Sequence, residues 1–133
     1  MFETADVPLR AGRWVPFAHE IHVEGVDLTG ATFVAQVRDR KDGGTVRADL
    51  ATVTSASAEG VRLAGVDVVD GVTVSRIALR INESTMDAMS VAEDRGEPGA
   101  DATIWWDMHV TPVGALKFRA FAGTFTIEAG VTQ

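Results

Sequence analysis

The chain has 133 residues and a mass of 14.1 kDa, which is room for one domain and not for two. It contains no cysteine, which excludes disulfides, thiolate metal sites and cysteine nucleophiles. Acidic residues outnumber basic ones by 19 to 12, for a net charge of −7, so we expect no nucleic-acid partner. The apolar runs are too short to cross a bilayer, and residues 1–13 lack the apolar core of a signal peptide. The expectation is a single domain over residues 1–133, with no membrane partner.

Short alternating runs of β-branched, aromatic and other apolar residues predict strands along most of the chain. The odd positions from 15 to 23 and from 33 to 37 are mostly apolar, which is typical of half-buried strands. Glycines in the segment 40–44 predict a hairpin turn that leads into a returning strand at 46–50. Alternation is clearest between residues 104 and 110. Roughly seven to nine strands at this spacing favour an antiparallel sandwich or a small barrel.

The apolar alternation changes parity at two places. Apolar residues stand at even positions in 72–74 and at odd positions in 77–81. A β-bulge near Ser75–Arg76 would reconcile the two halves within one strand. A similar shift separates the apolar residues of 116–118 from those of 121–127.

One short helix is predicted around residues 84–92. Ser84 and Asp87 have the spacing of a capping box, and Met86 and Met89 fall on one face. The helix is too short to be stable without packing against the sheets. The polar, glycine-containing stretch that follows, up to residue 101, is expected to be an exposed loop.

The histidines and the acidic loop are the candidates for a metal site. His19 and His22 lie three positions apart on a predicted strand, so their side chains face opposite sides and cannot chelate one ion. His109 would have to approach one of them in space. The acidic loop at 90–101 offers oxygens but lacks the spacing of a calcium-binding EF-hand. We therefore predict no metal and no other cofactor.

Catalytic motifs are absent from the sequence. No serine stands in a G-x-S-x-G elbow, and Gly43-Gly44 belongs to a hairpin turn rather than to a phosphate loop. A pair of carboxylates for glycoside hydrolysis depends on spatial separation, which a sequence does not give. The prediction is a protein that is not an enzyme, and a small hydrolase has no motif to support it.

The tandem Trp105-Trp106 is the feature most suited to binding. Trp106 shares a strand face with Ile104 and Met108 and is expected in the core. Trp105 faces the other way, beside Asp107, where it could stack on a sugar ring or wedge into a protein interface. The alternative is that both faces of this strand are covered within the fold.

Three segments together resemble a known family. They are DLTGAT at 27–32, WDMHVT at 106–111 and GTFTI at 123–127. In this order, over residues 14–132, the chain resembles small phage and prophage virion proteins similar to the N-terminal domain of baseplate upper proteins. The hairpin at 65–74 and the loop at 90–101 are longer than that family leads us to expect.

The resemblance implies an immunoglobulin-like β-sandwich and a non-enzymatic structural role in the virion. Such a protein of the tail, baseplate or fibre-attachment region docks with other virion proteins, as a symmetric homo-oligomer. We expect contacts through an extended N-terminal arm, residues 1–12, and through the acidic loop. The residues named for partner binding are Pro8, Leu9, Arg10, Glu93, Asp94 and Glu97. The alternative function is a carbohydrate-binding module that uses an exposed Trp105.

Overall fold

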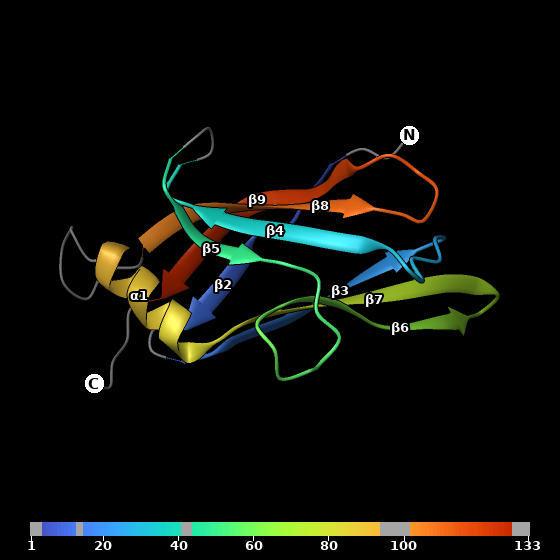
Figure 1. Ribbon diagram of the computed structural model, residues 1–133, viewed down its shortest axis with the longest axis horizontal. Coiled ribbons are helices and arrows are strands. Elements are labelled where there is room, and N and C mark those ends of the chain that lie inside the picture. Colours follow the sequence, from blue (N-terminus) through green and yellow to red (C-terminus); the bar gives the residue numbers. More distant parts are fainter. Residues whose placement is uncertain (1–3, 13–14, 41–43, 94–101, 129–133) are drawn as a thin grey trace.

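The computed structural model of the chain describes residues 4–12, 15–40, 44–93 and 102–128. Two β-sheets pack face to face, with one helix at one end among the described residues (Figure 1). This arrangement confirms the predicted all-β sandwich. In chain order the elements are β1 (Ala5–Asp6), β2 (Leu9–Gly12), β3 (Phe17–Glu24), β4 (Thr32–Arg38), β5 (Val46–Leu50), β6 (Gly60–Val69), β7 (Val72–Ile81), α1 (Glu83–Glu93), β8 (Ala102–Thr111) and β9 (Phe118–Glu128).

Strand order gives the sandwich an immunoglobulin-like topology. The larger sheet has the order β1-β9-β8-β4-β5, with β2 also paired to β9, and the smaller sheet has the order β3-β7-β6. The trios β3-β7-β6 and β4-β8-β9 correspond to strands B-E-D and C-F-G of an immunoglobulin sandwich. β1 and β2 run parallel to β9, and the other pairs are antiparallel.

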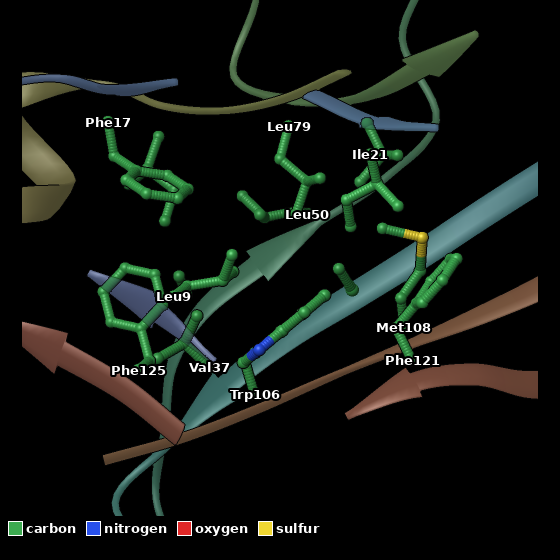
Figure 2. Packing of buried hydrophobic residues seen from close by; sticks show 14 of the residues in the cluster. Leu9, Phe17, Ile21, Val37, Leu50, Leu79, Trp106, Met108, Phe121 and Phe125 are labelled. Atoms are coloured by element: carbon green, nitrogen blue, oxygen red, sulfur yellow. The ribbon is translucent and has the colours of Figure 1, made fainter. Parts of the chain in front are cut away.

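The core lies between the sheets and includes alternating residues of β4 and β8 that the pattern predicted, together with Leu9 and Ala11, which it did not. Figure 2 shows Phe17, Ile21 and Leu79 of the smaller sheet facing side chains of the larger one. Phe17 meets Phe125 edge to face, with ring centroids 5.2 Å apart. Trp106 of β8 reaches into the space between the sheets and is 3% exposed, as its alternation predicted.

The N-terminal segment is part of the larger sheet, so the prediction of a free arm over residues 1–12 is wrong for residues 5–12. Leu9 pairs with Phe125 of β9 and is 2% exposed, which removes it from any partner surface. The prediction missed that β9 would otherwise be an edge strand with unpaired backbone groups. The alternation of buried Leu9 and Ala11 with exposed Arg10 is the pattern of a strand.

In addition to the pairing with β9, Trp106, Ala122 and Gly123 fix the course of the N-terminal segment at Val7. The Trp106 indole N–H donates to the backbone oxygen of Val7 (2.8 Å), and the Val7 N–H donates to Ala122 O (2.9 Å). Gly123 stands opposite Trp106 in the β8–β9 register. A Cβ atom on Gly123 would lie 2.5 Å from the Val7 oxygen, so only a glycine leaves room for this carbonyl.

Gly123→Ala should therefore push the N-terminal segment off β9. We expect a loss of about 1–3 kcal/mol in the free energy of unfolding, because a methyl group is forced against backbone. The measurements are urea denaturation and hydrogen exchange of the Val7 amide. Gly114→Ala is the control. A Cβ atom on Gly114 would meet nothing within 4 Å, and the strain from its positive φ (72°) would fall in the β8–β9 turn, away from Val7. Equal Val7 protection in both variants would contradict the explanation.

The first parity shift has a different cause from the predicted one, because β7 contains no bulge. The β3–β7 register is continuous, and Ser75 keeps the inward parity of Ile77. The bulge lies in the neighbouring strand β6, at Ala64. The second shift, in β9, coincides with a bulge at Ala120.

Ser75 is an inward-facing polar residue with no exposed surface, and its hydroxyl is fully used. It donates to Val26 O (2.6 Å) and accepts from the backbone N–H of Leu28 (3.0 Å). Leu28 is itself 4% exposed. The hydroxyl therefore fastens the β3–β4 loop to β7.

Ser75→Ala should leave the Leu28 N–H buried without an acceptor. The expected cost is about 1–3 kcal/mol in the free energy of unfolding, measured by urea denaturation. Ser57→Ala is the matched control, because Ser57 is exposed and only bonds to Ser55. A Ser75→Ala chain as stable as the Ser57→Ala chain would refute this role of the hydroxyl.

The helix is confirmed, and it packs as its methionines predicted. α1 contacts β5, and Met86 and Met89 have no exposed surface. Its first backbone hydrogen bond runs from Met86 N–H to Asn82 O. In the part of the chain that is described, no hydrogen bond joins Ser84 to Asp87, so the predicted capping box does not form.

Candidate functional site

Three connections lie at one end of the sandwich, on the right in Figure 1: the β3–β4 loop, the β6–β7 turn and the β8–β9 turn. We call them together the loop end. The β3–β4 loop joins the other two, because Gly25 N–H donates to Thr73 O (2.7 Å) at the start of β7. Gly30, in the same loop, faces Val113 of the β8–β9 turn so closely that an added Cβ atom would lie 2.7 Å from Val113.

Hydrogen bonds within the loop explain why its sequence folds this way. Asp27 Oδ1 accepts from the backbone N–H of Thr29 (2.9 Å) and from its hydroxyl (2.5 Å). The hydroxyl bond, which has the larger effect, and the backbone bond together hold the pKa of Asp27 below its usual range. The carboxylate and the positive φ of Gly30 (79°) shape the turn that DLTG predicted.

Stability at the loop should depend on pH through Asp27. A lowered folded-state pKa stabilises the fold above the unfolded-state pKa, and the contribution disappears as pH falls through the folded-state value. Asp27→Asn should thus lower Tm at neutral pH, and the difference from the native chain should vanish in acid. Thr29→Val removes the hydroxyl donor and should reduce this pH dependence. A Tm difference that stays constant down to acid pH would contradict the assignment.

Apolar side chains are exposed at the loop end. Val68 and Val69, beside the β6–β7 turn, are 71% and 54% exposed. Val113 and Leu116, in the β8–β9 turn, are 72% and 89% exposed. Asp70 and Gly71 form the β6–β7 turn with φ of 51° and 78°, a two-residue turn that holds these valines outward. Exposed apolar side chains on two turns at the same end of a sandwich are typical of a contact surface.

A second feature is a hollow of about 580 Å³ on the outer face of the larger sheet. Trp105 lines it and is half-buried, on the face opposite Trp106, as the alternation predicted. In the strand register Trp105 lies between Arg38 of β4 and Thr124 of β9, and Gln36 pairs with Asp107 in the next row. Gln36 Oε1 accepts hydrogen bonds from Nε (3.0 Å) and Nη2 of Arg38. The hollow therefore combines an indole with an amide, a guanidinium and a carboxylate.

The residues expected to bind partners are separated in the structure. Pro8 is exposed and lines the Trp105 hollow, whereas Arg10 forms an ion pair with Glu128 of β9 (3.1 Å). Glu93 is the last residue of α1. The remaining two, Asp94 and Glu97, lie outside the described residues.

The histidines do not meet. β3 is continuous, so His19 and His22 are on opposite faces, and His22 contacts Glu20 (2.7 Å). His109 belongs to β8 in the other sheet. Within residues 4–12, 15–40, 44–93 and 102–128, no group of three or more metal-ligating side chains occurs. No helix in those ranges is long and apolar enough to span a membrane.

Sequence reasoning missed both the loop end and the polar partners of Trp105. Adjacent valines before Asp70-Gly71 were a usable signal, because one of two neighbouring strand residues must face outward. Leu116 looked like a strand residue, although it follows the turn residues Pro112 and Gly114. The pairing of Arg38 with Trp105 had no signal, since it depends on the register between strands far apart in sequence.

Comparison with known proteins gives no family: the chain matches no protein-family model, no curated protein and no solved structure.

Proposed function

We propose that this protein is a non-enzymatic structural component of a phage particle, in the tail, baseplate or fibre-attachment region. It acts by docking with other virion proteins, in several symmetric copies. The observation that carries the proposal is the exposed apolar surface of the loop end. A symmetric assembly repeats a small contact many times, so a modest patch on each copy is sufficient.

The build of the loop end supports a docking role. Val68 and Val69 directly precede the two-residue turn between β6 and β7. The β3–β4 loop is fastened to β7 by Ser75. A surface held in this way loses little conformational entropy when a partner binds. The resemblance of the segments 27–32, 106–111 and 123–127 to virion proteins agrees with this role. In this fold they form most of the β3–β4 loop with the start of β4, the second half of β8 and five of the eleven residues of β9.

Charge at the loop end indicates what the partner presents. Glu24, Asp27 and Asp70 are exposed acidic residues of the loop end, and Lys117 is an exposed cation of the β8–β9 turn. Asp67 is paired with Arg76 (2.7 Å), so its charge is compensated within the fold. A complementary partner surface has an apolar centre with lysine or arginine at its rim.

Leu116→Asp should abolish docking and leave folding intact. The side chain is 89% exposed, so the free energy of unfolding should change by no more than about 0.5 kcal/mol, while a charge enters the apolar surface. The measurement is sedimentation of a prophage-induced lysate of the source cells, with detection of the chain by mass spectrometry. The native chain should sediment with particles, and the Leu116→Asp chain should remain with slow material.

Val46→Asp is the matched control. Val46 is 42% exposed at the start of β5, away from the loop end, and its substitution should leave sedimentation unchanged. A native chain found only with slow material would refute the virion role. If Leu116→Asp sediments with particles as well as Val46→Asp does, docking uses another surface.

A further inference from the structure

We propose that the hollow beside Trp105 binds an acidic saccharide, that is, a sugar chain that carries carboxylate groups. This site lies on the outer face of the larger sheet and not at the loop end. The proposal is therefore independent of the docking role and would hold for a chain that docks elsewhere.

The charge of the hollow is opposite to that of the whole chain. The chain carries a net charge of −7, whereas the residues that line the hollow include three cations and two anions. No ion pair joins these groups to one another or to other residues within the described parts of the chain. They are Arg38, Arg40, Arg119, Asp6 and Asp107. A concave surface with excess positive charge concentrates anions.

Arg38 is oriented to bind a carboxylate. Gln36 Oε1 accepts from its Nε and Nη2 atoms, which restrains the guanidinium on the face that Trp105 shares. Its Nη1 atom has no acceptor among the residues that the structure describes. A ligand carboxylate there would accept charge-assisted hydrogen bonds from a side chain that is already positioned.

The mixture of groups favours a saccharide over a simple anion. A phosphate ion would be attracted by Arg38 but would leave the indole of Trp105 and the carboxylates of Asp107 and Asp6 without matching groups. An acidic sugar has carboxylates for the arginines and hydroxyl donors for the aspartates. Its C–H surface can also lie against the indole of Trp105, as aromatic and polar groups combine in small-molecule sites.

The size of the hollow suits more than one sugar ring. Its volume of about 580 Å³ lies within the ~300–1,000 Å³ range of small-molecule sites. It follows β9 from Arg119 to Thr124, roughly 17 Å at ~3.3 Å per residue. The smaller hollow on the other sheet, about 300 Å³, includes Arg62 and Arg80 but no tryptophan, so it provides a control surface.

The test is calorimetric titration of the full chain with matched saccharides. Sialyllactose is compared with lactose, and trigalacturonic acid with maltotriose. At least one acidic probe should bind detectably at a ligand concentration of about 5 mM or below. At that concentration a ligand with a Kd of about 1 mM occupies most of its sites. Its neutral counterpart should bind about tenfold more weakly, and added salt should weaken the acidic ligand.

Variants assign the binding to the hollow. Arg38→Gln should weaken the acidic probe about tenfold, because a charge-assisted bond is lost. Arg62→Gln, on the other sheet, should leave its affinity unchanged. Trp105→Ala should also lose binding, and thermal melting checks that it folds; if it does not, Arg38→Gln alone decides.

Three results would overturn the proposal. They are no binding by either acidic probe, equal binding of an acidic probe and its neutral counterpart, and binding that Arg38→Gln does not weaken. None of them bears on sedimentation of the chain with particles, so the two proposals fail or stand separately.

Discussion

The buried indole N–H of Trp106 requires an acceptor inside the sandwich, and the course of the first strands follows from this requirement. A buried donor without a partner costs about 1–3 kcal/mol, so the chain gains by bringing a carbonyl to it. The carbonyl is that of Val7, 2.8 Å away, and Gly123 leaves the space for it. The first residues of the chain are thereby aligned along β9, where Leu9 enters the core. One hydrogen bond thus links the centre of the core to the edge of the larger sheet.

The same alignment shapes the surface on the other side of the sheet. Because β1 lies against β9, Asp6 borders the hollow that also contains Trp105. Trp105 and Trp106 are neighbours in sequence but serve opposite faces of β8, as the two-residue period of a strand requires. The residue that organises the core and the residue of the proposed saccharide site are therefore positioned by a single strand.

The loop end depends on a separate contact between loop and sheet. The Ser75 hydroxyl bonds to the backbone of Val26 and Leu28. The β3–β4 loop, which crosses from the smaller sheet to the larger one, is therefore tied to β7 of the smaller sheet. Gly30 of that loop packs against the β8–β9 turn of the larger sheet. Both sheets thus contribute to one end, where apolar side chains are presented. The proposed docking surface and the proposed saccharide site share no residue.

The sequence alone determined the fold class, most strand positions, the short helix and the inward face of β8. These features follow from local periodicity, which a sequence records directly. It did not determine that residues 5–12 form strands, that the bulge belongs to β6 and not to β7, or that Ser75 faces inward. It also gave no indication that Arg38 lies beside Trp105. Each of these was decided by the tertiary structure, because strand register and edge pairing arise between segments far apart in the chain, where local periodicity carries no information.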